Sequence, residues 1–444
     1  MYFGQIVLLE VVLRIGFRHS VAAALLIIAS AGWIPSAWGA ELKGTLTLLL
    51  AEHDRIKAAE EDLAAARERA KAALGVRYPT LGVTSHYGYE AQNKFESSNT
   101  SMPSREVNLE LTQKLWNFGA SSASIESARL TYKQAQENLE TAKQTLMLEG
   151  ISALLDVSRT QRNLEYAKQS VSNIKLQTEL EDVRVQEGSG YSTDVLQAKS
   201  QLISAEKLRI KAEEEYEVAL NRHKTVFGKY PKEEGDSPEP KIPTRLIPTS
   251  LERAIEIAQK NNPRLLYLEF GVQVAESTVA ETKANELFPS VNMVAGTKLK
   301  NDVAGTKGYQ GEHLVKVELS YDFNFGLSSF KRLQATKHDR QAAARRLKET
   351  RDQIEEQVRN KWKGLLLAQE NASFLVAKTS VSLEFLKLTR EERDLGRSSF
   401  MDVLTSETTL INALSEAVTA ETSTVTKAYE LLEVIGLLKV DWLQ

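Results

Sequence analysis

Two aspartates occupy equivalent places in two similar segments, and they are the residues best placed to do chemistry. Asp194 belongs to the segment Gly188-Ser-Gly-Tyr-Ser-Thr-Asp-Val-Leu, and Asp402 belongs to Gly396-Arg-Ser-Ser-Phe-Met-Asp-Val-Leu. A glycine that adopts positive φ can end a helix, and a carboxylate in the first turn of the next helix suits its dipole. Each segment therefore predicts a turn between two helices.

The two predicted turns differ in composition. The first holds a second glycine, Gly190, and continues with Ser192 and Thr193, either of which can cap the returning helix. The second holds Ser398 at the place that Gly190 takes in the first.

The rest of the sequence gives no sign of catalysis, of a cofactor or of a metal site. The chain has no cysteine, which excludes disulfides, thiolate metal sites and a cysteine nucleophile. Its six histidines show no metal-ligand spacing, and no Ser-His-Asp order or phosphate-binding glycine loop stands out. The net charge of −3 over 444 residues gives no reason to expect nucleic acid as a partner.

The two segments mark an internal duplication. Asp194 and Asp402 are 208 positions apart, and so are Gly228 and Gly436, which end the two copies of Val-x-Gly. Several landmarks in one register predict two repeats, 40–228 and 250–438, joined by a proline-rich linker at 229–249. Residues 1–39 read as a cleaved signal peptide, with an uncleaved membrane anchor as the alternative.

Long helices dominate both repeats. Each repeat begins with a helix, at 42–77 and 250–287. Two longer stretches almost free of glycine and proline follow in each, at 120–187, 193–227, 327–395 and 399–435. Apolar residues recur three and four apart along them, which is a coiled-coil seam, and alanine fills many of its positions. A helix of 68 residues would extend about 100 Å, so these helices must stand away from any globular body.

Four shorter segments alternate between apolar and polar residues and predict two strand hairpins. They span 80–89, 105–116, 290–299 and 313–325, with loops at 91–104 and 300–311. One face of each is apolar, and the other is polar. The residues expected on the polar face are Glu106, Asn108, Glu110, Lys316, Glu318 and Asp322.

Strands of about ten residues with one apolar and one ionic face suit a membrane barrel, whose apolar face meets lipid. Four strands cannot close a barrel, so several copies of the chain must contribute, and three copies give twelve strands. The alternative is an ordinary soluble sheet with one buried face. Trp116, Tyr87, Tyr89 and Tyr321 are candidates for an aromatic girdle at the membrane interface, or for plain packing.

In this order and spacing the chain resembles the TolC-like outer membrane efflux protein family over residues 42–440. The resemblance is carried by the tandem repeat, by Pro79 and Pro289 before the first strand of each hairpin, by Gly119 and Gly326 after the second, and by the two glycine turns. It implies a mainly α fold with a membrane β part. A homotrimer would form a 12-stranded barrel in the outer membrane, continued by a periplasmic α-helical barrel.

The resemblance also implies a function and partners. The chain would be the passive exit duct of a tripartite efflux or type I secretion system, working with a periplasmic adaptor and an inner-membrane transporter. Asp402, and less clearly Asp194, would line the periplasmic aperture, where symmetry-related carboxylates raise each other's pKa and bind cations. Gly188, Gly190, Gly396 and Ser398 would form the tip that meets the adaptor.

The site residues of the family are only partly matched in this chain, and two alternatives stay open. The family's second acidic position is Thr405 here, and its latching arginine is Ser398, so we expect a differently latched tip. Asp194 and Asp402 can instead be helix-capping residues alone. The alternative function is a non-channel periplasmic coiled-coil scaffold or adaptor.

Overall fold

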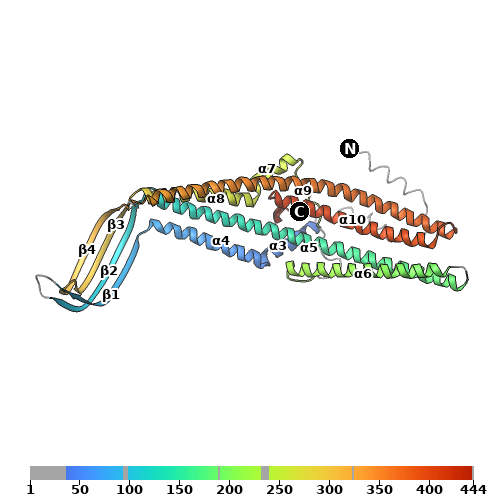
Figure 1. The fold of residues 1–444 in the computed structure, drawn as a ribbon, viewed down its shortest axis with the longest axis horizontal. Coiled ribbons are helices and arrows are strands. Elements are labelled where there is room, and N and C mark those ends of the chain that lie inside the picture. The colour runs from blue at the N-terminus through green and yellow to red at the C-terminus, as the bar shows by residue number, and fades with distance from the viewer. Residues whose placement is uncertain (1–36, 94–98, 189–190, 232–239, 323–324, 443–444) are drawn as a thin grey trace.

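The computed structural model describes residues 37–93, 99–188, 191–231, 240–322 and 325–442, so that the expected signal peptide falls almost entirely outside the described residues. The molecule is elongated, with one sheet at one end and a long bundle of helices extending from it (Figure 1). The strands are β1 (Thr80–Gln92), β2 (Thr100–Trp116), β3 (Ser290–Val303) and β4 (Thr306–Ser320). The α-helices are α3 (Ala37–Glu52), α4 (Asp54–Ala73), α5 (Ala120–Gln186), α6 (Ser192–Phe227), α7 (Leu251–Asn261), α8 (Pro263–Leu287), α9 (Ser328–Asp394) and α10 (Phe400–Val434).

The helices continue the order of the strands. The sheet is antiparallel with the order β1-β2-β3-β4. In the half of the bundle nearest the sheet, α4, α5, α8 and α9 lie side by side in that same order (Figure 1). In the other half α6 takes the place of α4, and α10 takes the place of α8. The bundle is therefore a row of helices with two open edges. The predicted mainly α fold, with strand hairpins and long helical hairpins in tandem, is confirmed.

Two helices run the full length of the bundle. α5 and α9 each have 67 residues, and at about 1.5 Å rise per residue each extends about 100 Å. Gly119, with φ 90°, precedes α5, and Gly228, with φ 74°, ends α6. These left-handed positions favour glycine because a side chain there is strained.

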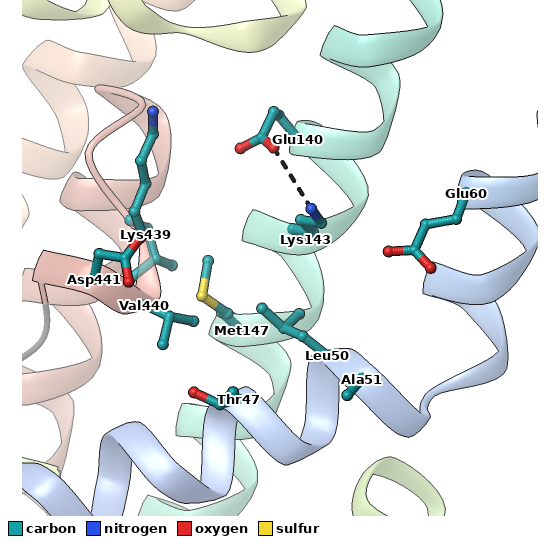
Figure 2. A pocket seen from close by; sticks show the side chains of 11 residues that line it. Thr47, Leu50, Ala51, Glu60, Glu140, Lys143, Met147, Lys439, Val440 and Asp441 are labelled. Carbon is teal, nitrogen blue, oxygen red and sulfur yellow. Dashed lines mark ion pairs between the residues drawn. The ribbon is translucent and has the colours of Figure 1, made fainter. Parts of the chain in front are cut away.

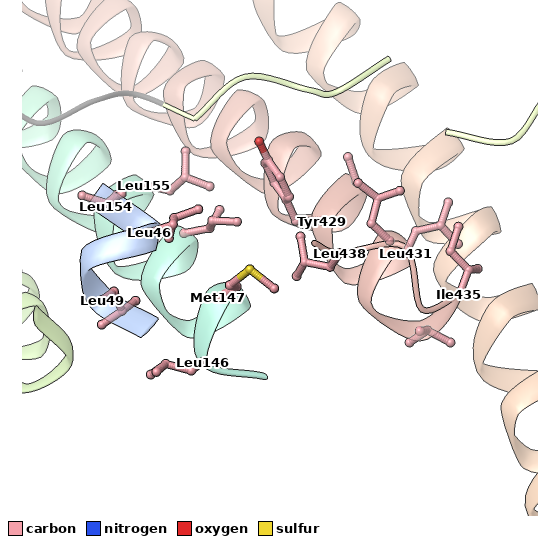
Figure 3. Packing of buried hydrophobic residues seen from close by; sticks show 14 of the residues in the cluster. Leu46, Leu49, Leu146, Met147, Leu154, Leu155, Tyr429, Leu431, Ile435 and Leu438 are labelled. Atoms are coloured by element: carbon pink, nitrogen blue, oxygen red, sulfur yellow. The ribbon is translucent and has the colours of Figure 1, made fainter. Parts of the chain in front are cut away.

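The main core lies at mid-length, where α3, α5, α10 and the C-terminal segment meet (Figure 3). Leu46, Met147 and Leu438 are among its buried residues. The seam of α5 loses its apolar phase at Gly150, yet the helix continues. A Cβ at Gly150 would lie 2.7 Å from Cδ2 of Leu49, so glycine here admits the close approach of α3.

Each repeat begins with two helices, so the single helices expected over 42–77 and 250–287 are wrong. His53 caps α4 by accepting a hydrogen bond from the Arg55 N–H (3.1 Å). Asn262 caps α8 in the same way, accepting from the N–H groups of Arg264 and Leu265. Pro263 then stands in the first turn, where its missing N–H costs no hydrogen bond. A capping side chain ends one helix and starts the next without interrupting the apolar periodicity of the sequence.

The glycine that ends the last long helix of each repeat has different surroundings in the two repeats. Gly436 has φ 75°, and a Cβ there would lie 2.3 Å from the Asn261 carbonyl oxygen. The Asn262 side chain also donates to the Val434 carbonyl (2.7 Å), which ties the end of α10 to the α7–α8 junction. Gly228, the equivalent of Gly436, has nothing within 4 Å of such a Cβ.

The strands are longer at the hairpin ends than the sequence pattern predicts. β3 and β4 continue to a tight turn at Val303↔Thr306, so the glycine-rich loop expected over 300–311 is wrong. Asp302 and Ala304 both have φ 54° there, a conformation that aspartate tolerates and alanine rarely adopts. β2 begins at Thr100 and includes Pro103, which has a paired strand on one side only.

The last strand ends earlier than predicted. β3 begins at Ser290 because Pro289 has no N–H to continue the ladder, and its partner Ser320 is the last residue of β4. The expected extension of this strand to 325 is therefore wrong, and Asp322 lies outside the sheet. Part of that extension, 323–324, falls outside the described residues.

The described part of the linker runs beside the core without regular secondary structure from residue 240. The buried Tyr429 hydroxyl donates to the Lys241 carbonyl (2.9 Å) and fixes the linker there. None of the helices in the described part of the chain combines the length and apolar composition that a membrane-spanning helix needs.

Candidate functional site

The end of the bundle far from the sheet, called here the distal end, holds both predicted turns. Gly188 has φ 81° and Gly396 has φ 71°, as the helix-ending role requires. The second turn closes with a hydrogen bond from the Arg397 N–H to the Glu392 carbonyl (2.8 Å). Gly190 lies outside the described residues.

Asp402 forms a capping box with Ser399 at the start of α10. The Ser399 hydroxyl accepts from the Asp402 N–H (3.1 Å), and Oδ2 of Asp402 accepts from the Ser399 N–H (2.9 Å). The Ser399 and Ser398 hydroxyls also reach Oδ2, at 2.6 and 3.3 Å. Hydrogen bonds from the Ser399 side chain and backbone lower the pKa of Asp402, which is exposed. Its charge therefore stabilises this turn.

Asp194 has a different setting at the start of α6. Tyr191 is the N-cap and makes no side-chain capping bond, so the expected cap from Ser192 or Thr193 is wrong. The Asp194 N–H donates to the Tyr191 carbonyl (3.0 Å), and the side chain is half-buried. In the described residues no hydrogen bond or ion pair joins Asp194 to Asp402.

A buried carboxylate that the sequence pattern did not single out joins the two repeats near the distal end. Glu407 of α10 is 1% exposed and accepts hydrogen bonds from Asn173 and from Gln177 (2.8 Å), both on α5. Arg390 of α9 completes its environment with an ion pair at 2.8 Å. Removing one partner of a buried pair leaves an uncompensated charge, so this cluster favours one arrangement of α5, α9 and α10.

A second buried carboxylate lies beside the first. Glu181 of α5 is 2% exposed, and both of its oxygens accept from Arg393 of α9, at 3.1 and 3.3 Å. The Arg393 guanidinium also stacks over the Phe400 ring, 5.6 Å from its centre. Glu181 continues the seam of Leu164, Ala167, Val171 and Ile174 at the same spacing. A charged residue at a seam position was thus the signal available in the sequence.

Apolar contacts reinforce the same joint. Phe400 and Leu404 of α10 are buried against Ile174 of α5 and against Ala198 and Ala205 of α6. The distal end therefore unites the helix pairs α5–α6 and α9–α10 through both buried ion pairs and apolar packing.

The sheet has two chemically different faces at the other end of the molecule. The register places Glu106 opposite Lys300 and Asn108 opposite Lys298, so all four lie on one face. Glu110, Lys316 and Glu318 lie on that same face, whereas Asp322 lies outside the sheet. Ion pairs join Lys300 to Glu312 and Lys316 to Glu318, each at 2.7 Å.

The opposite face is apolar and bare. Leu81, Val83, Val315, Val317 and Leu319 are all more than 60% exposed, although large apolar side chains are normally covered. Trp116 and Tyr321 are exposed at the end of the sheet nearest the helices, and Tyr87 and Tyr89 are exposed towards the hairpin turns.

A half-open cavity of about 350 Å³ lies at mid-length between α3, α5 and the C-terminal segment (Figure 2). Leu50, Met147 and Val440 line it, and an ion pair between Glu140 and Lys143 (3.7 Å) lies at its rim. Within the described ranges, no group of three or more histidine, aspartate or glutamate side chains could hold a metal ion.

Comparison with known proteins shows a family match that extends over both repeats. The family described as "Outer membrane efflux protein" matches residues 45–229 and 254–437, which are the two repeats. The outer membrane efflux protein BepC of Brucella suis biovar 1 (strain 1330) is 23% identical over 340 residues, covering 76% of this chain and 73% of BepC.

Solved structures share the fold at lower identity. The outer membrane protein VceC of Vibrio cholerae superimposes with a TM-score of 0.76 at 16% identity, covering 89% of this chain and 96% of VceC. The MtrE outer membrane channel of Neisseria gonorrhoeae, in its open state, gives 0.75 at 17% identity and covers 89% of each chain.

Proposed function

The chain belongs to the outer membrane efflux protein family and is an outer-membrane channel for efflux, and from this premise we propose that three copies assemble into one passive duct. The observation that carries the proposal is a four-stranded sheet bare on both faces, one apolar and one ionic. Twelve strands from three copies would turn the apolar face to lipid and the ionic face to an aqueous lumen. Export through such a duct needs no catalytic step by this chain.

The aromatic residues support a definite depth in the membrane. Trp116 lies roughly 11 residues further along β2 than Arg105, the partner of Tyr87. That is about 36 Å of strand, or roughly 28 Å once the strand is tilted by about 40°. Two girdles, of Trp116 and Tyr321 and of Tyr87 and Tyr89, would then border an apolar band of about 25 Å.

The helical bundle would continue the duct into the periplasm and close at the distal end. Asp402 is exposed there, so three copies of it would form an acidic ring at the aperture, with Asp194 nearby. The turns at Gly188, Gly190, Gly396 and Ser398 are the proposed contact for a periplasmic adaptor, which would link the duct to an inner-membrane transporter.

The latch would be the buried carboxylates rather than the turn itself. An opening that moves the α9–α10 pair away from α5 must break the contacts of Glu407 with Asn173 and Gln177, and that of Glu181 with Arg393. Ser398 makes no such bridge between the helix pairs. Its hydroxyl bonds to Asp402 of its own turn.

Reconstitution in a planar bilayer tests the duct. We expect purified protein to form trimers with discrete conductance steps, small in the closed state and larger when Asn173, Gln177 and Arg393 are all replaced by alanine. A stable trimer without conductance, even with Asp402→Ala, would refute the duct and favour a coiled-coil scaffold.

A further inference from the structure

The apolar face of the sheet carries one charged residue, Arg105 of β2. The residues that the register places on this face share odd numbers, within 81–91, 101–113, 291–301 and 309–319. Among these described positions, Arg105 is the one with a formal charge, and it is exposed. An arginine that faces lipid is costly by an amount that grows with its depth in the membrane. Its level along the strand therefore decides what it can meet.

Arg105 belongs to a polar row that crosses all four strands. The row reads Tyr87↔Arg105↔Asn301↔Tyr309 through the three strand pairings. The mostly apolar band lies between this row and Trp116, and it is about 28 Å thick once the strands are tilted. The row therefore lies where the hydrocarbon ends and the lipid headgroups begin.

The side of the membrane follows from the shape of the molecule. The hairpin ends of the sheet lie farthest from the helices, so with the bundle in the periplasm they face the cell exterior (Figure 1). The outer leaflet of an outer membrane consists largely of glycolipids whose sugars carry phosphate monoesters. The groups beside Arg105 would therefore be anionic lipid headgroups.

The Arg105 guanidinium has no anionic partner within the described part of the chain. Its Cζ lies 5.3 Å from the centre of the Tyr87 ring. Contact with a ring face occupies no acceptor oxygen, so the N–H donors stay available for an anion. Glu90 and Asp302, at this end of the sheet, accept hydrogen bonds from backbone N–H groups of the β3–β4 hairpin instead, at 3.1 and 2.8 Å.

We propose that Arg105 binds a phosphate monoester of an outer-leaflet glycolipid, with the Asn301 amide as a neighbouring donor. A planar guanidinium donates two parallel N–H bonds to a phosphate. A monoester offers three free oxygens and up to two negative charges. Asn301 is the cross-strand partner of Arg105, about 5 Å away, so both can reach one phosphate. The inference rests on the proposed function, because it needs the apolar face to meet lipid.

A phosphate carried by a lipid fits this place better than a free phosphate ion. The apolar band begins directly beside the row, so acyl chains lying on it would hold the headgroup at Arg105. An ion from solution has one guanidinium and neutral donors to hold it. Free phosphate therefore becomes an outcome of the test.

Lipid binding by the protein in detergent tests the site, with native mass spectrometry as the readout. The probes are a purified glycolipid with two phosphate monoesters (lipid A) and the same lipid after enzymatic removal of both. We expect the phosphorylated lipid to bind roughly tenfold more tightly, and Arg105→Gln to remove this difference. Arg105 is exposed, so the variant should fold. Arg105→Gln that binds the phosphorylated lipid as tightly as the unchanged protein would overturn the proposal.

A matched control removes a positive charge from the other face of the same sheet. Lys298 pairs with Asn108 on the polar face, where lipid cannot reach. Lys298→Gln should change the affinity for the phosphorylated lipid by less than about twofold. A loss as large as that of Arg105→Gln would mean that net charge, and not a site, attracts the lipid.

Inorganic phosphate alone is the second arm of the test, measured by titration calorimetry. We expect it to bind at least about tenfold more weakly than the lipid, because it has no acyl chains to bury. Phosphate binding as tight as that of the lipid, and lost in Arg105→Gln, would assign the site to the free ion and overturn the proposal.

Conductance of the same preparations separates this inference from the proposed function. Trimers that conduct but bind both lipids equally would refute the lipid site and leave the duct intact. Binding that depends on Arg105 in a preparation without conductance would refute the duct and support the site.

Discussion

Arg390 and Glu407 form an ion pair in which one partner is buried and the other is not. The Glu407 side chain is 2% exposed and the Arg390 side chain is 49% exposed, with 2.8 Å between them. The cost of breaking this contact therefore falls on the carboxylate, which keeps only the amides of Asn173 and Gln177.

Arg390→Ala should destabilise the protein by about 3 kcal/mol, the lower end of the range for breaking a buried pair, because the guanidinium itself is half exposed. Thermal unfolding in detergent measures this. Arg359→Ala, which removes an exposed pair with Glu355 on the same helix, should cost less than about 0.5 kcal/mol. Equal effects of the two variants would contradict the role given to Glu407.

The cap of α10 should weaken in acid. The folded-state pKa of Asp402 is lowered, so its contribution is fully present above its unfolded pKa of about 4 and is lost as pH falls through the folded value. Hydrogen exchange of the first turn of α10, followed from pH 6 to pH 3, should show this loss. Asp402→Asn should abolish the pH dependence. If that variant keeps it, another group is responsible.

The hydroxyl of the capping box makes a separate prediction. Ser399→Ala should cost about 1 kcal/mol, as removal of an N-cap does, and should speed exchange at the start of α10. Ser192→Ala should change stability by less than about 0.5 kcal/mol, because α6 has no side-chain cap. Similar losses in both would mean that the two turns are equivalent.

The equivalent glycines Gly228 and Gly436 should respond differently to alanine. Both have φ near 75°, so each variant carries the left-handed penalty of about 1 kcal/mol. Gly436→Ala also places Cβ 2.3 Å from the Asn261 carbonyl oxygen, which forces a backbone shift and raises the total to about 3 kcal/mol. Chemical denaturation compares them, and a smaller loss for Gly436→Ala would disprove the close contact.

The ionic face of the sheet should set the charge preference of the duct. Lys316→Gln leaves Glu318 without its ion pair. The ratio of cation to anion permeability should then rise about two- to threefold, because the polar face loses one positive charge. Reversal potentials in a salt gradient measure it. Lys211→Gln, on exposed α6, serves as control, and an equal shift there would argue against a lumen on the sheet's polar face.

The parts of the fold that follow from local periodicity could be predicted from the sequence. The long seams, the alternating strands and the glycine turns each depend on neighbouring residues, so the two repeats and their elements were recognisable. His53 and Asn262 were missed as helix ends because a capping side chain interrupts hydrogen bonding without interrupting the apolar pattern. The β3–β4 turn was read as a loop because glycine and polar residues are common in both.

The distal joint could not be predicted in the same way. Glu407 and Asn173 are 234 positions apart, and nothing local in either segment indicates the other. The sequence pattern pointed to Asp402 by its position in the motif, and the structure shows that this carboxylate is held by its own turn. Whether Asp402 and Asp194 also line an aperture stays a prediction.

The different lengths of the helices determine how the helical bundle would respond to a force applied at one end. α5 and α9 are single helices over its whole length, whereas the neighbouring positions are filled by pairs of shorter helices, α4 with α6 and α8 with α10 (Figure 1). Bending a continuous helix strains its own backbone hydrogen bonds, whereas two separate helices can change their relative angle without straining the backbone hydrogen bonds within either helix. Two continuous helices, α5 and α9, thus alternate with two positions that are each filled by a pair of shorter helices. Bending of the bundle would therefore be easiest at mid-length, where the shorter helices end. A pull or twist applied at the distal end would therefore travel up α5 and α9 to the foot of β2 and β4, while the shorter helices absorb the change in angle.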